Sequence, residues 1–314
     1  MKIGIIGLGA IGQRLIKVFN EHQETEIVAI CDANESVLQS TKDVLPSAAA
    51  YTDYQNLLAR DEVELVYIAV PPKYHHQIAL DSVKKGKHIL CEKPLANSLE
   101  EADEMRNAVA GKNLINAMNF PVFYRSEFHK IDQLVKDKYI GELLRVEVKV
   151  HFPDWPRPWQ QNPWIAGREQ GGFVREVVPH YLQMVQRFFG PINSVDAFME
   201  FPEDPALCET SVIARLKLAS GVPVLLDGLS KTAEKEEVLL KIYGTEGTIA
   251  LRNWTVLETA GKGEDLSPVE VGNTNQNLSL VDELIKAING EDAKIINFEE
   301  GYEIQQVLEK ILSE

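Results

Sequence analysis

Cysteine is scarce in this chain of 314 residues. The three cysteines, Cys31, Cys91 and Cys208, lie far apart and form no C-x-x-C pair, which argues against a disulfide framework and against a cysteine-rich zinc site. An odd number of separate thiols is typical of a reducing compartment. We therefore expect reduced, mostly buried thiols, no bound metal and a cytoplasmic location.

The sequence also lacks long hydrophobic runs and an excess of positive charge. No stretch of eighteen apolar residues occurs, and the apolar start at 3–11 is interrupted by glycines without a cleavage site after it, which argues against a membrane span or a signal peptide. The 47 acidic residues outnumber the 32 basic ones, for a formal net charge of -15. Because such a charge repels phosphate backbones and anionic lipids, we expect neither nucleic acid nor a membrane as a partner.

What the sequence does contain is the composition of a soluble globular protein, with 45% hydrophobic and 25% charged residues. Its length predicts two domains. Up to residue 119, short apolar segments alternate with segments of helical periodicity. Strands are expected at 2–7, 26–31, 65–70, 88–91 and 114–118. Because strands separated by helices connect through right-handed crossovers, this part predicts a doubly wound parallel sheet.

After residue 120 the pattern changes to alternation. Within 144–152, Val146, Val148 and Val150 alternate with charged side chains, as in an antiparallel strand with one buried face. The second half is therefore predicted to be an α+β domain with a largely antiparallel, open-faced sheet, and the domains span 1–120 and 121–314. Further strands are expected at 195–201, 210–219, 222–230, 238–243 and 248–257, and helices at 128–138, 173–189, 278–289 and 298–312.

The first motif that indicates chemistry is Gly7-Leu-Gly9-Ala-Ile-Gly12, between a predicted strand and a predicted helix. Glycines at this spacing permit a tight turn, close approach of the backbone to a pyrophosphate, and close packing of helix on strand. Asp32 ends the next predicted strand, where a carboxylate can accept hydrogen bonds from ribose hydroxyls. Because Asp32 repels a 2′-phosphate and no arginine directly follows it, NAD is favoured over NADP. The alternative is a glycine-rich turn without a ligand.

The second motif, Cys91-Glu-Lys-Pro94, follows another predicted strand, at the sheet edge where open α/β folds bind their ligands. The ammonium group of Lys93 can hydrogen-bond a substrate oxygen and stabilise negative charge on it, or share a proton with it. The alternative is a solvated, charged turn. Pro71 and His75 belong to a second loop at the same edge, although His75 is equally compatible with an ordinary surface residue at a helix start.

The third motif is Gly171-Gly-Phe-Val-Arg-Glu-Val-Val-Pro-His180. On a helix, Glu176 and His180 share one face, so the carboxylate can orient the imidazole and make His180 an acid/base group. The alternative is a surface ion pair. Pro179 removes a backbone N–H and can kink the helix just before His180.

Three tryptophans and two arginines crowd the loop 152–172 ahead of that helix. Such side chains can cover a substrate and exclude water, and packing between elements explains the tryptophans equally well. We expect this loop to decide which substrate is accepted.

Together the three motifs resemble the glucose-fructose oxidoreductase / inositol dehydrogenase (Gfo/Idh/MocA) family of nicotinamide-dependent oxidoreductases, over essentially the whole chain. The resemblance rests on G-L-G-A-I-G, V-P-P-K-Y-H, G-K-H-I-L-C-E-K-P-L-A, the G-G pair with His180 downstream, and Y-G-T-E-G-T. It implies a Rossmann domain followed by an open-faced α/β domain, and association through the open sheet face into a homodimer or homotetramer. It also implies that Lys93 is the active-site lysine, His180 the catalytic histidine and Glu176 its acidic partner.

The third motif departs from the family pattern at four positions. The family usually has Asp, Gly and Asp where this chain has Glu176, Val178 and Gln183, and an apolar residue in place of Arg175. Arg175 can pair with Glu176 or bind an anionic group of a substrate.

We therefore expect an NAD(H)-dependent oxidoreductase acting on a secondary alcohol, or the matching ketone, of a small polar substrate resembling a sugar or polyol. Lys93, His180 and Glu176 are the expected catalytic residues, and either Lys93 or His180 accepts the proton. The alternatives are an imine reductase of the same family and a non-catalytic regulator that senses a dinucleotide. The residues expected at the cofactor are Gly7, Gly9, Ala10, Ile11, Gly12, Asp32, Val70, Pro71, His75, Glu92 and Lys93.

Overall fold

The computed structural model describes residues 1–160, 162–271 and 278–313. The chain divides into two compact units. Unit 1 consists of Met1–Phe120 together with Ser279–Tyr302, and unit 2 consists of Pro121–Leu278 together with the residues from Glu303 onward. The segment Ser279–Tyr302, which the sequence pattern assigns to the second domain, is thus part of unit 1.

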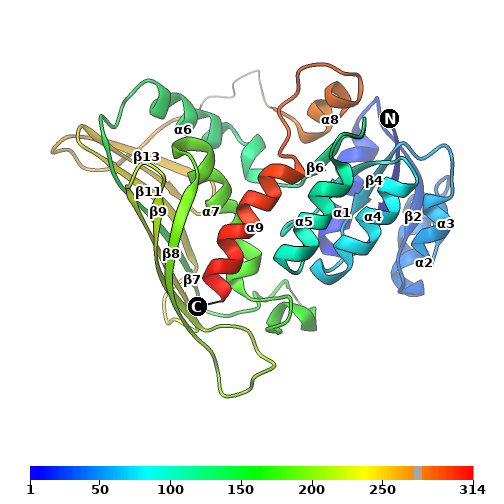
Figure 1. The fold of residues 1–314 in the computed structure, drawn as a ribbon, viewed down its shortest axis with the longest axis horizontal. Coiled ribbons are helices and arrows are strands. Elements are labelled where there is room, and N and C mark those ends of the chain that lie inside the picture. Colours follow the sequence, from blue (N-terminus) through cyan, green and yellow to red (C-terminus); the bar gives the residue numbers. More distant parts are fainter. Residues whose placement is uncertain (161, 272–277, 314) are drawn as a thin grey trace. The chain divides into compact units, whose positions relative to one another are not determined.

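Unit 1 is built on a six-stranded parallel sheet with strand order β3-β2-β1-β4-β5-β6, of which β2, β4 and β6 are labelled in Figure 1. The doubly wound sheet predicted from the sequence is confirmed. The chain proceeds outward from β1 in both directions, so the strand order reverses between β1 and β4, which is where such sheets bind ligands. The strands are β1 (Lys2–Ile6), β2 (Glu26–Cys31), β3 (Ala49–Tyr51), β4 (Leu65–Ile68), β5 (His88–Cys91) and β6 (Asn116–Met118). The short strand β3, paired with β2, has no counterpart in the sequence prediction.

The helices of unit 1 include one that arrives from the far end of the chain. Val281 and Leu284 of α8 are fully buried in the cluster that also contains Ile3, Ile5 and Phe19. This burial explains why Ser279–Tyr302 belongs to unit 1. The helices are α1 (Ala10–Glu21), α2 (Glu35–Val44), α3 (Tyr54–Leu58), α4 (His75–Lys84), α5 (Leu99–Val109) and α8 (Leu280–Ile288), with a 3₁₀ turn at Pro72–Tyr74. Helix α9 (Phe298–Leu312) begins in unit 1 and continues in unit 2.

Unit 2 is built on an eight-stranded sheet with order β14-β13-β12-β11-β7-β10-β9-β8. All neighbouring strands are antiparallel except β7 and β10. The predicted, largely antiparallel sheet is therefore confirmed. Its strands are β7 (Leu143–Phe152), β8 (Ile192–Glu200), β9 (Ser211–Leu218), β10 (Pro223–Ser230), β11 (Glu237–Gly244), β12 (Gly247–Arg252), β13 (Val256–Gly261) and β14 (Ser267–Pro268).

One face of this sheet is covered and the other is open. Val146, Val148 and Val150 of β7 are buried, and helix α7 (Phe173–Phe189) lies against β7 (Figure 1). Phe198 of β8 and Ile213 of β9 are 74% and 65% exposed, although they are cross-strand neighbours. The remaining helical segments of unit 2 are α6 (Ser126–Lys136) and 3₁₀ turns at Pro121–Tyr124 and Pro163–Ala166.

The single strand predicted over 248–257 is wrong, because a hairpin turn divides it into β12 and β13. The Thr255 N–H donates a hydrogen bond to the Arg252 carbonyl (3.2 Å), and the two central residues, Asn253 and Trp254, have φ of 49° and 70°. Positive φ at both central positions defines a type I′ turn, in which the second residue is usually glycine. The sequence has Trp254 there, so the usual turn signal is missing.

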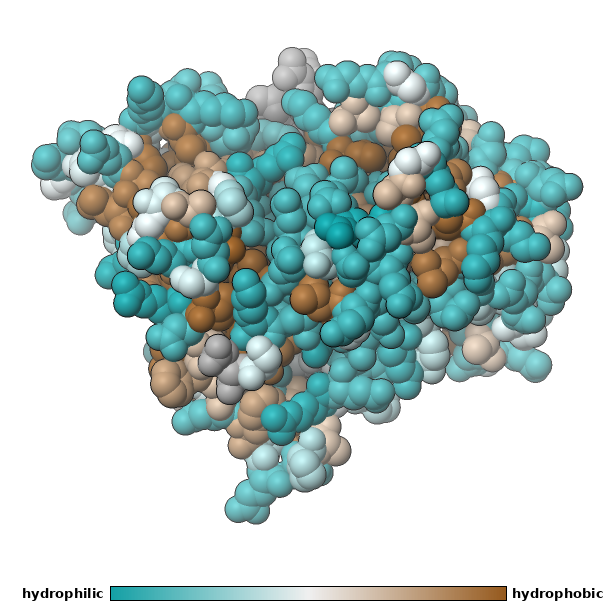
Figure 2. Space-filling model, viewed as in Figure 1, coloured by the Kyte–Doolittle hydropathy of each residue, from teal (hydrophilic) through white to brown (hydrophobic). Residues whose placement is uncertain are grey.

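The remaining predictions can be checked element by element. The helix predicted at 173–189 is confirmed to the residue, with Pro179 inside it. The three cysteines are buried and carry free thiols, and burial raises the pKa of Cys31 and Cys208 to about 12. No helix in the described residues is long and apolar enough to cross a membrane. Hydrophilic residues cover most of the face shown in Figure 2, as the high content of charged residues leads one to expect.

Candidate active site

Two glycines of the turn after β1 are required by the packing of unit 1 itself. Gly7 has φ of +95°, and a Cβ atom at this position would lie 2.5 Å from the carbonyl atoms of Ala69. A Cβ atom on Gly12 would lie 2.2 Å from the carbonyl oxygen of Gly7. These contacts bring the start of α1 close to β1 and to the segment that follows β4, as the sequence predicts.

The middle glycine, Gly9, is different, because protein packing does not account for it. A Cβ atom on Gly9 would meet no heavy atom of the described chain within 4 Å. Gly9 is also the N-cap of α1, where no described side chain caps the helix, and no acidic residue stands in the first turn, which begins with Ala10 and Ile11. The bare backbone therefore borders open space at a helix N-terminus, where N–H groups and the helix dipole favour an anion.

Asp32 is held beside this turn by two backbone hydrogen bonds. Its Oδ2 accepts the N–H of Leu8 and its Oδ1 accepts the N–H of Asn34, both at 2.8 Å. Each carboxylate oxygen keeps a further lone pair, so Asp32 can still accept hydroxyl donors. The open backbone at Gly9 and the fixed carboxylate at the end of β2 together fit the pyrophosphate and the ribose of NAD.

The loop after β5 places Lys93 next to a buried polar network. Glu92 is 7% exposed, and its Oε1 accepts hydrogen bonds from the Tyr67 hydroxyl and the Asn119 amide, both at 2.6 Å. Burial raises the pKa of Glu92. Lys93 itself is half-buried. The network fixes the backbone next to Lys93, so Glu92 has a structural role at the site. The contact of Glu92 with the cofactor stays a prediction.

His75 joins the two loops at this edge of the sheet. It is fully buried, and its Nδ1 and Nε2 lie 3.0 Å and 2.8 Å from the carbonyl oxygens of Pro94 and Val70. Burial lowers the pKa of His75. A neutral imidazole has one N–H and donates it to one of these two carbonyls, and the buried ring packs between the loop containing Val70 and Pro71 and the loop that carries Lys93.

In unit 2, the N-terminus of α7 is closed by a residue that the sequence analysis missed. Glu209 is 3% exposed and accepts the N–H of Val174 at 2.7 Å. A Cβ atom on Gly172, which has φ of +97°, would lie 2.2 Å from the Glu209 carboxylate. Burial raises the pKa of Glu209 to about 7. The second glycine of the pair in the third motif, Gly172, therefore makes room for this carboxylate, and no local pattern around residue 209 signals the role.

Glu176 and His180 both lie on α7 and are both half-buried. Their spacing of four residues places them on one face of the helix, as predicted. The His180 ring also contacts Trp254, with centroids 5.6 Å apart and the planes at 81°. Trp254 stacks on Tyr181 as well, at 4.9 Å and 24°. Sequence analysis did not single out Trp254, since its contact depends on the hairpin that the pattern failed to predict.

Arg175 forms an ion pair elsewhere than the sequence suggested. Its Nη1 donates to Oε1 of Glu309 in α9 at 3.1 Å, and Gln305 donates to the same oxygen at 2.7 Å. The Arg175 side chain is only 11% exposed. This pairing joins α7 to α9 within unit 2, and it accounts for the charge at a position where the family usually has an apolar residue.

The tryptophan-rich loop is organised around Arg157, and residue 161 of this loop lies outside the described residues. The Arg157 guanidinium forms a bidentate pair with Glu236, with distances of 2.9 to 3.1 Å. It also lies over the rings of Phe152, Trp155 and Trp159, at 4.6 to 5.9 Å from their centroids. The stacked guanidinium and the ion pair fix the loop to the residue that precedes β11.

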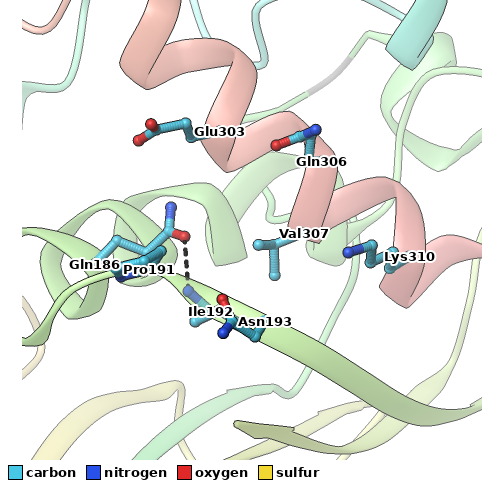
Figure 3. Close-up of a pocket in the computed structure, with 8 residues that line it drawn as sticks. All are labelled: Gln186, Pro191, Ile192, Asn193, Glu303, Gln306, Val307 and Lys310. Carbon is cyan, nitrogen blue, oxygen red and sulfur yellow. Dashed lines mark hydrogen bonds between the residues drawn. The ribbon is translucent and has the colours of Figure 1, made fainter. Parts of the chain in front are cut away.

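A pocket of about 260 Å³ lies in unit 2 among the C-terminal part of α7, the start of β8 and α9 (Figure 3). The close-up shows Gln186 turned toward β8, where its side chain accepts the N–H of Ile192 at 3.2 Å. Helix α9 contributes Glu303, Gln306 and Lys310 to the lining. The lining residues include none of the predicted catalytic residues, so this pocket is separate from the motifs described above. Within the described ranges, no group of three or more His, Cys, Asp or Glu side chains is arranged to hold a metal ion.

Comparison with known proteins gives matches in both units. Residues 1–120 match the model of the oxidoreductase family with an NAD-binding Rossmann fold, GFO_IDH_MocA, and residues 128–250 match the GFO/IDH/MocA C-terminal domain. An uncharacterized oxidoreductase of Synechocystis is 27% identical over 80% of this chain and 71% of its own length. Myo-inositol 2-dehydrogenase of Thermotoga maritima is 24% identical over 84% of this chain and 80% of its own. The structure of levoglucosan dehydrogenase in complex with NADH and L-sorbose superposes with a TM-score of 0.85 at 19% identity, covering 100% of this chain and 96% of that one.

Proposed function

The chain belongs to the GFO/IDH/MocA family of oxidoreductases, and from that premise we propose that it transfers hydride between NAD and a carbon that bears a secondary hydroxyl group in a sugar or polyol. One observation carries the proposal. The glycine turn at 7–12, here called the nucleotide cradle, follows β1, and Lys93 follows β5 of the same parallel sheet. Both therefore lie at the carboxyl edge of that sheet. This shared edge supports the proposal that the Lys93 cation acts next to the bound cofactor.

The chain's own residues have separate tasks in this reaction. The first turn of α1 binds the phosphates and Asp32 binds the ribose, while NAD, when bound, supplies the hydride chemistry. The Lys93 ammonium donates a hydrogen bond to the substrate oxygen and stabilises the negative charge that develops there. Its fixed backbone, held through Glu92 and His75, keeps this donor in place.

We assign the proton of the substrate hydroxyl to His180, with Glu176 orienting the imidazole from the preceding turn of α7. In the direction of ketone reduction the same imidazole returns the proton. Lys93 is the other candidate acceptor of this proton. The fixed tryptophan-rich loop around Arg157 supplies aromatic surface that can exclude water from a small substrate.

The substrate class is supported by the relatives. One similar protein is a myo-inositol dehydrogenase, and another is a levoglucosan dehydrogenase whose structure contains L-sorbose; all three compounds are small polyhydroxylated molecules. The alternative of an imine reductase drew on Arg175, and its pairing with Glu309 accounts for that residue without a substrate.

We also propose that the open face of the eight-stranded sheet, with Phe198 and Ile213 exposed, joins copies of the chain into a homodimer or homotetramer.

The test combines binding with turnover. Calorimetry measures the affinity for NAD+, NADH and NADPH, and the absorbance of the reduced cofactor follows reactions with myo-inositol, levoglucosan, L-sorbose and a cyclic imine. We expect NADH to bind at least about tenfold more tightly than NADPH, because Asp32 repels a 2′-phosphate. We expect turnover with a polyol or sugar and none with the imine. Binding without turnover on any of these compounds would favour the dinucleotide sensor instead.

A matched pair of variants tests the cradle itself. Gly9→Val adds a side chain in open space, whereas Gly12→Val drives one into the Gly7 carbonyl. We expect Gly9→Val to keep the melting temperature of the wild type and to weaken NADH binding by about tenfold or more. Gly12→Val is expected to lower the melting temperature. Equal NADH affinity in Gly9→Val and wild type would refute the proposed position of the pyrophosphate.

A further inference from the structure

The turn between β12 and β13 places a bulky residue in an unfavourable backbone conformation. Trp254 has φ of 70° at the second central position of a type I′ turn, where glycine is the usual residue because side chains clash in the left-handed region. Bulky residues in this region are rare and occur mainly where the surrounding structure requires them. Because tryptophan is unfavourable for the turn itself, we expect its side chain to make a favourable contact outside the hairpin.

The conformation of the turn is enforced from a neighbouring strand. The Asn253 N–H donates to the Val238 carbonyl at 2.7 Å, and the Asn253 side chain accepts the Val238 N–H at 3.1 Å. These two bonds fix the residue before Trp254 to the start of β11. The indole is thus carried on a rigid base and cannot leave α7 by a simple movement of the turn.

The indole contacts two consecutive residues of α7. It stacks on Tyr181, with ring centroids at 4.9 Å, and it meets the His180 ring at 5.6 Å with the planes at 81°. Tyr181 is 1% exposed, and its buried hydroxyl has no hydrogen-bond partner in the described part of the chain. Its ring is therefore held by packing against Trp254 and not by a polar anchor.

We propose that Trp254 is a positioning residue that fixes the orientation of the His180 imidazole. The proposal rests on the proposed function, in which His180 takes up the substrate proton. Pro179 has no N–H, so the helix lacks one backbone hydrogen bond immediately before His180. Glu176 orients the imidazole from the same helix, α7. The Trp254 indole, in the turn between β12 and β13, limits the rotation of that imidazole. A ring misaimed by rotation loses proton transfer while substrate and cofactor still bind.

The experiment compares three variants with the wild type, using whichever of myo-inositol and levoglucosan is oxidised faster. Trp254→Gly removes the ring and relieves the backbone, and Trp254→Phe restores an aromatic ring. Lys138→Gly is the control for relief of the backbone alone, because Lys138 is an exposed residue that also has a positive φ, 58°, after α6. We expect Trp254→Gly to lower kcat about tenfold or more, with the KM values for NAD+ and substrate within about twofold of the wild type. Trp254→Phe should recover most of kcat, and Lys138→Gly should match the wild type.

Two further readouts separate positioning from a merely structural role. The primary isotope effect with substrate deuterated at the reacting carbon should rise in Trp254→Gly, because the chemical step becomes slower than product release. Proton NMR of the histidine rings, with His180 assigned by its loss in His180→Asn, should show a ring-current shift that disappears in Trp254→Gly. An unchanged His180 signal in Trp254→Gly, or a changed signal with wild-type kcat, would overturn the inference.

The proposed function can fail independently of this result. If His180→Asn keeps wild-type turnover, the catalytic role of His180 is wrong, and the positioning inference falls with it. If His180→Asn loses turnover but Trp254→Gly does not, the function stands and the inference alone is wrong. When both lose turnover, the double variant should be no slower than His180→Asn, because an imidazole that is absent cannot be misaimed.

Discussion

Lys93, the lysine proposed above to contact the substrate, is assigned from a sequence motif, while the fold supports the backbone on either side of it. Pro94 follows Lys93 in the loop. Glu92 precedes it, is buried, and accepts hydrogen bonds from Tyr67 and Asn119. The two partners lie on β4 and just after β6, on either side of β5. A motif of three residues therefore depends on contacts with both neighbouring strands of the sheet.

We predict that Lys93→Met abolishes turnover and largely preserves the binding of NADH. Methionine retains an unbranched side chain of four heavy atoms and lacks the ammonium group that is proposed to stabilise charge on the substrate oxygen, so kcat/KM should fall by about a hundredfold or more. Lys85→Met, which changes an exposed lysine of the same unit, should have wild-type activity. Turnover in Lys93→Met close to that of the control would exclude Lys93 from the reaction.

The residues of the candidate site differ in how visible they are in the sequence. Gly7, Gly9 and Gly12 can be assigned because their spacing reports a local backbone requirement. Glu209 and Trp254 cannot be found in this way, since each contacts α7 from a loop or turn that is distant in the chain. Only the register of the second sheet brings them there, and no local period encodes that register.

At the level of elements, helix α7 is the clearest case in which pattern and structure agree. Its apolar periodicity and its flanking glycines gave its bounds, and Gly190 with φ of 88° ends it. The β12–β13 hairpin is the clearest failure. Its turn has Asn253 but lacks the glycine that usually follows, and alternation continues through it, so the pattern predicts one strand.

The carboxylate that closes α7 predicts a particular pH dependence of stability. Burial raises the folded-state pKa of Glu209 from 4.5 to about 7. The folded state therefore binds this proton more tightly than the unfolded state, so the contribution favours folding below the unfolded pKa and is lost as the pH rises through about 7. The shift corresponds to a loss of about 3 kcal/mol in the free energy of unfolding.

Urea unfolding of wild type and Glu209→Gln, from about pH 5 to about pH 8, checks this sign. The amide oxygen of glutamine can still accept the Val174 N–H, but the side chain does not titrate. We expect the stability of the wild type relative to Glu209→Gln to decline steadily across this range. Parallel stability curves would show that the carboxylate does not hold an excess proton in the folded protein.

At the scale of the whole molecule, the open face of the eight-stranded sheet is the feature that most needs a partner. Phe198 and Ile213 are exposed side by side on β8 and β9. A monomeric protein seldom exposes large apolar side chains in contiguous groups.

The fold class and both sheets can be predicted from periodicity. The assignment of Ser279–Tyr302 to unit 1 cannot, because the apolar face of an amphipathic helix does not indicate which core the helix joins.

We predict that Phe198→Asp combined with Ile213→Asp reduces the assembly to monomers in sedimentation velocity experiments. Two buried carboxylates without partners would oppose association strongly. Val44→Asp provides the control, because Val44 is 71% exposed on α2 of unit 1 and should leave the sedimentation coefficient unchanged. A wild-type protein that sediments as a monomer would remove the proposed interface altogether.

The return of α8 to the first core has a consequence for biosynthesis. A ribosome that has completed β6 has released every strand of the parallel sheet but not yet Val281 and Leu284, which fill the cluster around Ile3 and Phe19. During synthesis, unit 1 therefore lacks α8, and part of its hydrophobic core stays uncovered, until the whole of the eight-stranded sheet has been translated. Unit 1 is therefore begun first but completed only after most of unit 2 has been synthesised, and the residues from Glu303 onward then complete unit 2.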